Sequence, residues 1–120
     1  PQKSWEQIQK ILLSFQSNCL NNQTKCLVVI IPDENQVNQN VLDQALANVG
    51  KVQTDLALDY PQQLLTKFLK ENQFDYLDLL PSFQQAGKDK ILYHPRDTHW
   101  NIAGNQLAAQ EIYRVMENIK

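Results

Sequence analysis

The chain has 120 residues, the length of one domain or of part of one. A hydrophobic content of 42% is typical of a globular protein and excludes a disordered chain. The formal net charge of -2, without a basic cluster, gives no electrostatic basis for binding nucleic acid or an anionic membrane surface. No apolar run approaches the roughly 18 residues of a membrane helix.

The first half of the chain predicts a helix, a strand and a second helix. Residues 4–20 carry apolar side chains in steps of three and four, and Ser4 is a suitable N-cap. The run 26–31, "CLVVII", is typical of a strand buried on both faces of a parallel sheet. A polar loop then leads to a helix at about 37–49, closed by Gly50. The apolar positions of the first helix are Trp5, Ile8, Ile11, Leu12, Phe15 and Cys19.

The second half predicts a helix, a strand and a closing helix. Residues 51–61 fit either a short strand or a surface loop, and Tyr60-Pro61 opens a helix. The alternation in "FDYLDLL", residues 74–80, predicts a strand, and 81–87 fit a short helix or a turn. A last amphipathic helix is marked by Ile102, Leu107, Ile112, Val115, Met116 and Ile119, with small residues at Ala108 and Ala109 that let it lie close to a sheet.

This order of elements describes α/β crossovers on a parallel sheet. Only two strands are clear, whereas a free-standing doubly wound domain has about five. The chain also begins with Pro1 rather than Met and enters a helical pattern at once. We therefore predict a three-layer α/β/α fold with a parallel sheet, of the flavodoxin-like kind, that is an incomplete part of a domain in a longer protein.

The two cysteines leave two interpretations open. Cys19 and Cys26 can be small buried thiols, or they can form a disulfide across the helix-to-strand turn if the protein is secreted. Their spacing of seven residues excludes a C-x-x-C metal or redox site. The compartment is not determined, and it would be extracytoplasmic if the full-length protein carries an N-terminal signal or anchor.

Residues 92–104, "LYHPRDTHWNIAG", differ in composition from the rest of the chain. Both histidines, one of the two arginines, an aspartate and a tryptophan fall within seven residues. In a turn, Asp97 can fix one ring nitrogen of His99 and leave the other for a substrate, as a general base requires. Folds of this kind place their active sites in loops at the carboxyl edge of a parallel sheet. The loop is therefore a candidate acid–base site.

Two other interpretations of the loop compete with catalysis. His94, Asp97 and His99 could ligate zinc, although their spacing matches no strong metal motif. Alternatively the residues are structural, with Asp97 or Asn101 capping the last helix, Trp100 in the core and His94 exposed. A single D-x-H pair does not decide between these interpretations.

A longer block, "DTHWNIAGNQLAAQEI", resembles the last conserved block of the SGNH (GDSL-type) hydrolase superfamily. The stretches "LVVIIPDENQV", "FDYLDLLPSFQ" and "ILYHPRDTHWN" resemble the strands and the approach to the catalytic loop in bacterial members, so that the resemblance spans about residues 26–118. It implies that Asp97 is the triad acid and His99 the triad base, and that Trp100, Asn101 and Gly104 shape the loop.

The chain departs from the superfamily pattern in two ways. The D-x-H spacing, in place of D-x-x-H, resembles the branch that includes the alginate O-acetylation proteins, so acyl transfer and hydrolysis both stay open. The nucleophile block (Gly-Asp-Ser) and the oxyanion blocks are absent from these residues. Ser82 follows a strand but lacks the glycines of a nucleophile elbow. The resemblance implies that the serine lies outside this chain.

We therefore predict that residues 1–120 are the C-terminal part of an SGNH-like domain. It would supply the Asp97–His99 pair to a serine-dependent esterase, lipase or O-acyltransferase, and would be nearly inactive alone. Arg96 could bind a substrate anion, although an ion pair at the surface is expected, and Tyr93 and Trp100 could line an acyl or sugar pocket or lie in the core. The expected partner is an ester- or acyl-bearing small molecule or polysaccharide, without a metal or organic cofactor. The alternative is a non-catalytic SGNH-like binding or structural domain.

Overall fold

The computed structural model describes residues 2–52 and 57–119 and has six helices and two strands in these ranges. Among the described residues, no helix is both long and apolar enough to cross a membrane. In chain order the elements are α1 (Gln2–Asn21), β1 (Leu27–Ile30), α2 (Glu34–Val37), α3 (Gln39–Asn48), α4 (Tyr60–Glu71), β2 (Asp75–Asp78), α5 (Leu80–Gly87) and α6 (Ile102–Met116).

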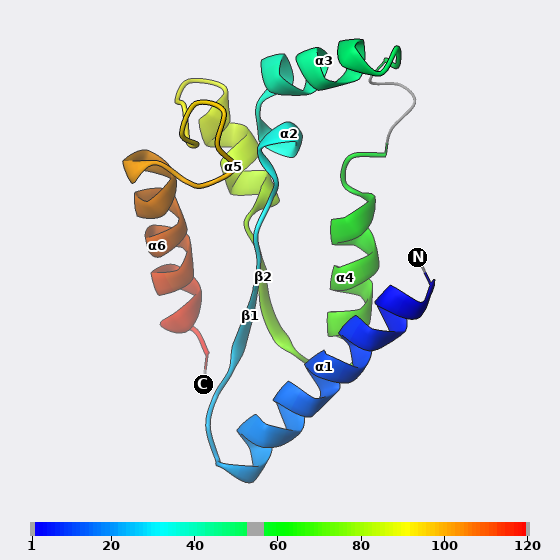
Figure 1. The fold of residues 1–120 in the computed structure, drawn as a ribbon. Coiled ribbons are helices and arrows are strands. Elements are labelled where there is room, and N and C mark those ends of the chain that lie inside the picture. The colour runs from blue at the N-terminus through cyan, green and yellow to red at the C-terminus, as the bar shows by residue number, and fades with distance from the viewer. Residues whose placement is uncertain (1, 53–56, 120) are drawn as a thin grey trace.

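The two strands form a parallel sheet in the middle of the molecule (Figure 1). The register aligns Leu27 with Asp75 and Ile30 with Asp78, and the Leu79 N–H extends the pairing by donating to the Ile30 carbonyl over 3.1 Å. The crossover between the strands contains α2, α3 and α4, and helices lie on both sides of the sheet in Figure 1. The structure is therefore a mixed α/β fold with mostly helical content.

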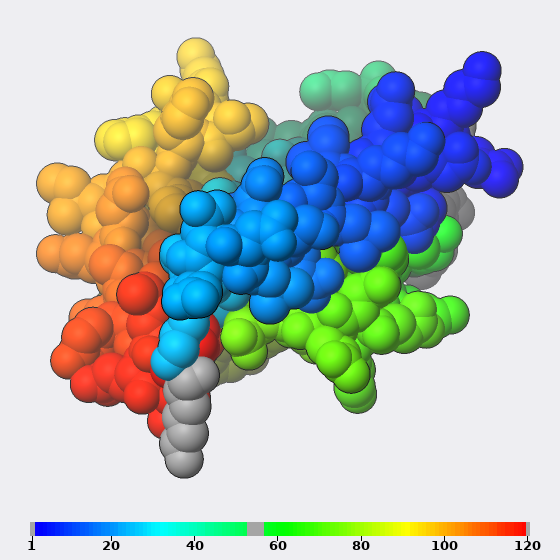
Figure 2. Space-filling model, turned by 90° about the horizontal axis from the view of Figure 1, so that it is seen from below, coloured from blue at the N-terminus to red at the C-terminus, as the bar shows by residue number. Residues whose placement is uncertain are grey.

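One face of the sheet packs against α1 and α4. Ile30, Phe68 and Leu69 form a buried cluster there, and the ring of Trp5 meets that of Phe68 edge-on at 5.7 Å. Val28 and Tyr76, which point to the same face because side chains alternate along a strand, pack against this cluster. Seen from below, α1 runs across the middle of the molecule between α6 and α4 (Figure 2).

The opposite face packs against α5, α6 and the loop that joins them. Leu79, Phe83, Leu92, Tyr93 and Ala108 form the second buried cluster, against which Val29 and Leu77 of the strands pack. Ala108 is 3% exposed, so the small side chain brings α6 close to its neighbours as predicted, whereas Ala109 is exposed. The loop at the carboxyl end of the sheet is thus anchored in a core.

Several sequence predictions are corrected by the structure. Helix α1 begins at Gln2, so Ser4 lies inside the helix and is not its N-cap, because the preceding Gln and Lys are good helix formers. The predicted polar loop after β1 contains the helical turn α2, which Asp33 caps with its side chain. Gly50 has a φ of +66°, as its position after a helix requires.

The sequence predicts a wider buried face for α1 and α6 than the structure shows. Ile8, Ile11 and Phe15 of α1 are exposed, as are Ile102 and Met116 of α6. Each helix contacts the rest of the chain along a narrow strip, since in the described part of the chain only two strands lie between the helical layers. The prediction for residues 51–61 falls partly on 53–56, which lie outside the described residues, and α4 begins directly at Tyr60.

A disulfide joins Cys19 at the end of α1 to Cys26 before β1. Of the two interpretations of these cysteines, the structure therefore shows the bridge rather than free thiols. The radius of gyration is 16.2 Å, above the value of about 14 Å that is typical of a compact domain of this length. The layers are thus spread more widely than in a compact domain.

Candidate active site

The candidate loop is a short hairpin that leaves the core and returns to it. Tyr93 and Trp100 pair as an antiparallel bridge. The His94 N–H donates to the His99 carbonyl and the Asn101 N–H to the Leu92 carbonyl, both over 3.0 Å. These bonds fix the two arms of the hairpin relative to each other, so the residues at its tip have a defined backbone.

A tight turn at the tip reverses the chain before Asp97. The Asp97 N–H donates to the His94 carbonyl over 3.1 Å, and Arg96 has a φ of +56°. A proline followed by a residue with positive φ is the pattern of a type II turn, in which Pro95 and Arg96 take the two central positions. This turn places Asp97 immediately before the arm that carries His99.

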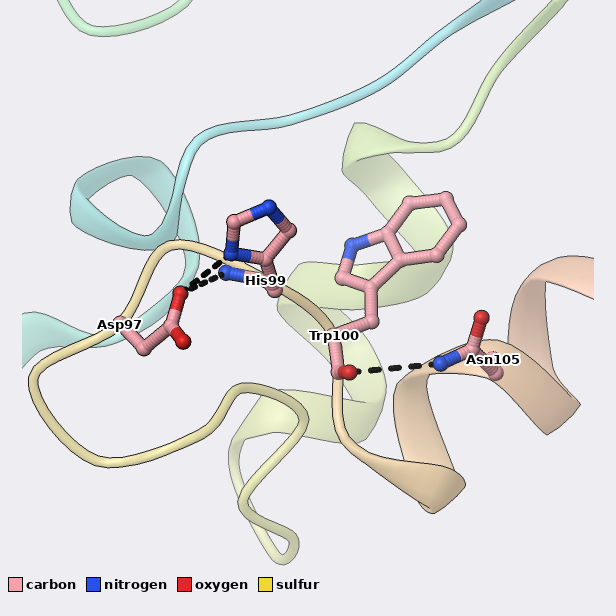
Figure 3. Close-up of polar contacts among 4 residues, drawn as sticks. All are labelled: Asp97, His99, Trp100 and Asn105. Atoms are coloured by element: carbon pink, nitrogen blue, oxygen red, sulfur yellow. Dashed lines mark hydrogen bonds and ion pairs between the residues drawn. The ribbon is translucent and has the colours of Figure 1, made fainter.

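Asp97 and His99 form the pair that the sequence predicted (Figure 3). The Asp97 Oδ1 lies 2.5 Å from the His99 Nδ1 and also accepts the His99 backbone N–H over 3.0 Å. The bond from the His99 ring, and then the backbone bond, hold the pKa of the Asp97 carboxyl below its ordinary value of 3.8. The carboxylate therefore stays charged and orients the imidazole through Nδ1, as the acid of a catalytic triad does.

The base of the hairpin is fastened to the end of β1. The Tyr93 hydroxyl donates to the Pro32 carbonyl over 2.9 Å, and the Tyr93 backbone pairs with that of Trp100. Burial raises the pKa of Tyr93 to about 12, with Asp33 and Glu34 adding to it. Tyr93 is 2% exposed, so it belongs to the core and shapes the loop rather than lining a pocket.

Asn101 joins the hairpin to α6. Its Oδ1 caps the helix by accepting the Gly104 N–H over 3.0 Å, while its Nδ2 donates to the Ile91 carbonyl over 2.7 Å. A Cβ on Gly104 would lie 2.3 Å from the Leu92 carbonyl oxygen, so only glycine lets the helix start this close to the hairpin. Asn101, and not Asp97, is therefore the residue that caps the last helix.

An open hollow of about 290 Å³ lies beside His99. It is lined by Ile31, Thr98, His99, Trp100 and Asn105. In Figure 3 the rings of His99 and Trp100 project to the same side of the hairpin. The His99 side chain is 83% exposed and bonds Asp97 through Nδ1, which leaves Nε2 free of that bond.

The sequence did not indicate three residues of this region. Ile31 and Asn105 reach the hollow only because the end of β1 and the start of α6 meet there. Glu34 is buried beside the site, and burial, followed by the charges of Asp33 and Asp97, raises its pKa. The one available signal was that Glu34 begins the helical turn that follows β1, because the carboxyl edge of the sheet gathers functional side chains.

The remaining candidate residues and the candidate metal site gain no support from the structure. Arg96 is exposed and, within residues 2–52 and 57–119, forms no ion pair, which corrects the expected pair at the surface. In the same ranges, no group of three or more His, Cys, Asp or Glu side chains is placed to hold a metal ion. Ser82 lies in α5 and makes no hydrogen bond to His99.

The Asp-x-His hairpin thus lies at the carboxyl end of the parallel sheet, where Tyr93 bonds the Pro32 carbonyl after β1. The family model described as "SGNH hydrolase-like domain, acetyltransferase AlgX" matches residues 2–120. The chain belongs to this family, which confirms the resemblance to the superfamily and to its O-acetylation branch. Comparisons with curated proteins and with solved structures gave no match.

Proposed function

We propose that Asp97 and His99 are the acid and base of an O-acetyltransferase site that acts on a polysaccharide. The observation that carries this proposal is the bond of 2.5 Å between the Asp97 carboxylate and the His99 Nδ1, with the rest of the ring open to a hollow. Membership in an acetyltransferase family supports transfer over hydrolysis.

The nucleophile in this proposal is a serine outside the 120 residues. Three of the four serines of the chain, Ser4, Ser14 and Ser17, lie on α1, which packs on the other face of the sheet from the hairpin. The fourth, Ser82, lies in the first turn of α5 and lacks the glycines of a nucleophile elbow. None of them donates a hydrogen bond to His99 among the described residues.

The reaction would proceed in two steps, acetylation of the serine and transfer of the acetyl group to the sugar. In the first, His99 Nε2 takes the serine proton as the serine oxygen attacks the acetyl carbonyl of a donor ester, and returns it to the leaving alcohol. In the second, His99 takes the proton of a sugar hydroxyl as its oxygen attacks the acetyl-serine, and returns it to the serine. Asp97 stabilises the imidazolium in both steps.

We also propose that the chain is the Asp–His-bearing part of a larger three-layer SGNH-like domain, the C-terminal part in the superfamily's usual order. β1, "LVVI", has no charged residue, whereas β2 has aspartate at both ends, so β1 has the composition of a central strand. Within the described residues β1 pairs only with β2. A sheet of two strands is smaller than the usual sheet of about four to six strands, which supports further strands beside β1.

The proposal is tested by treating the full-length parent protein with a fluorophosphonate probe and identifying the labelled residue by mass spectrometry. We expect a serine outside residues 1–120 to be labelled, and His99→Ala to slow labelling on the order of 10³-fold. His94→Ala is the matched control, since it removes the other histidine of the same hairpin and should label normally. An unlabelled but folded parent protein would contradict catalysis and favour a non-catalytic domain.

A further inference from the structure

The walls of the hollow beside His99 combine one aromatic ring with exposed polar groups. Trp100 contacts Phe83 on the core side, with ring centroids 5.2 Å apart, and also lines the hollow. Ile31, which directly follows β1, is 63% exposed and adds a second apolar wall. An exposed isoleucine beside a tryptophan is apolar surface that water covers poorly and that a ligand can cover.

Polar groups stand at the rim of these apolar walls. The Asn105 amide nitrogen is occupied, since it donates to the carbonyls of Trp100 and Asn101 over 3.3 and 2.9 Å, which leaves its Oδ1 as an acceptor. The Thr98 hydroxyl is exposed and, among the described residues, makes no hydrogen bond. His99 Nε2 completes the rim. An acceptor, a hydroxyl and an imidazole nitrogen thus surround an apolar floor.

We propose that this hollow is the subsite for the sugar ring that receives the acetyl group, with Trp100 as its stacking platform. A pyranose has the matching chemistry, because its C–H face packs on an aromatic ring while its hydroxyls point outward to hydrogen-bonding groups. The volume of about 290 Å³ is at the lower end of ligand pockets, which suits one ring and not a bulky ligand.

This inference rests on the proposed function, since it assigns the hollow to the acceptor of the same reaction. A ring bound there brings its hydroxyls to the side of His99 that Asp97 leaves open. The bound ring would also cover the His99 side chain, which is 83% exposed without it, and the exclusion of water favours transfer to a sugar hydroxyl over hydrolysis. Trp100 and Ile31 would therefore determine the specificity for the acceptor.

The binding test uses the full-length parent protein and the nitrogen-bound indole protons of Trp100 and Trp5. NMR spectra are recorded while a neutral β-1,4-linked hexose tetramer, a β-1,4-linked uronate tetramer or the open-chain polyol sorbitol is added. We expect saturable shifts of the Trp100 indole N–H with a tetramer and none with sorbitol. Trp5, which packs on Phe68 on the other face of the sheet, is the internal control and should not shift.

Substitutions of two exposed isoleucines test whether the sugar binds in the hollow. Ile31→Asn should weaken binding about tenfold, because it removes an apolar wall of the hollow. Ile102→Asn is the matched control: Ile102 is 78% exposed, does not line the hollow and should leave binding unchanged. Since both positions are exposed, neither change removes a core side chain, so a loss of binding reports on the hollow rather than on folding.

Three outcomes would overturn the proposal: no shift of Trp100 with either tetramer, equal shifts with sorbitol, or Ile31→Asn binding that matches Ile102→Asn binding. These outcomes leave the proposed function standing if the parent protein still shows labelling of a serine that depends on His99. If the sugar binds but no serine of the parent protein is labelled, the proposed function is contradicted. The hollow would then be a sugar-binding site without catalysis.

Discussion

The two ends of the sheet are held together by different means. At the amino end, the disulfide between Cys19 and Cys26 ties α1 to β1, and Phe74, directly before β2, packs on the apolar cluster around Phe68. At the carboxyl end, hydrogen bonds to backbone groups fix the hairpin that carries His99. The amino end is held by covalent and apolar contacts, and the carboxyl end by a polar network.

This difference indicates which end of the sheet contributes mainly to activity and which contributes mainly to stability. A hydrogen-bond network can hold an exposed side chain in one orientation, which apolar packing would do only by burying it. His99 is 83% exposed and still has a defined ring orientation, because Asp97 bonds it twice. Changes at the carboxyl end should therefore alter activity first, and changes at the amino end should alter the free energy of unfolding first.

The largest effect is expected for Asp97→Asn in the full-length parent protein. The amide keeps the size of the side chain but removes the charge that stabilises the imidazolium, so acetyl transfer should fall on the order of 10³- to 10⁴-fold. The free energy of unfolding should change little, because Asp97 is exposed. Measured rates of acetyl transfer and denaturant unfolding curves check both statements. A variant with near-normal rates would show that Asp97 is not the triad acid.

Gly104→Ala should lower both the activity and the free energy of unfolding. The new Cβ would lie 2.3 Å from the Leu92 carbonyl oxygen and 3.0 Å from the Trp100 Cβ, which should lower the free energy of unfolding by about 3 kcal/mol. Gly50→Ala is the control, because nothing lies within 4 Å and only its φ of +66° is disfavoured; it should cost about 1 kcal/mol. Equal losses in the two variants, measured by urea unfolding, would contradict the close packing of α6.

Removing the disulfide should affect the amino end alone. Cys19→Ser with Cys26→Ser should lower the free energy of unfolding by about 2–3 kcal/mol, since the short closed loop gains conformational freedom in the unfolded chain. The pairing of Asp97 with His99 should persist, as read from the carboxyl carbon shift of Asp97 by NMR. A shifted Asp97 signal in the folded double variant would show that the two ends of the sheet are coupled.

The smallest expected effect concerns the stability that the ionised Asp97 carboxyl adds, which depends on pH. Because the pKa of the folded state lies below the ordinary value of 3.8, Asp97 adds stability that is complete above that value and is lost as pH falls through the folded pKa. An NMR titration should give a midpoint below 3.8, and His99→Ala should raise it toward 3.8. His94→Ala should raise it less, because the charge of His94 is the weakest cause. A midpoint that does not respond to His99→Ala would refute the pairing.

The sequence by itself determined the features that depend on neighbours in the chain. The apolar run of β1, the start of α6 after Asn101 and the approach of Asp97 to His99 all follow from residues a few positions apart, since turns and caps are local structures. The family also follows from such a block, because "DTHWN" and the small residues after it are contiguous.

Only the tertiary structure decided which faces are buried and what supports the hairpin. Tyr93 reaches Pro32 across 61 residues, and Ile31 meets Trp100 in one hollow. The helical period of α1 placed Ile8 and Ile11 on its apolar face, yet they remain exposed. Periodicity gives the direction of a side chain relative to its own helix, whereas burial depends on whether another element lies there, and that is decided only when distant segments pack together.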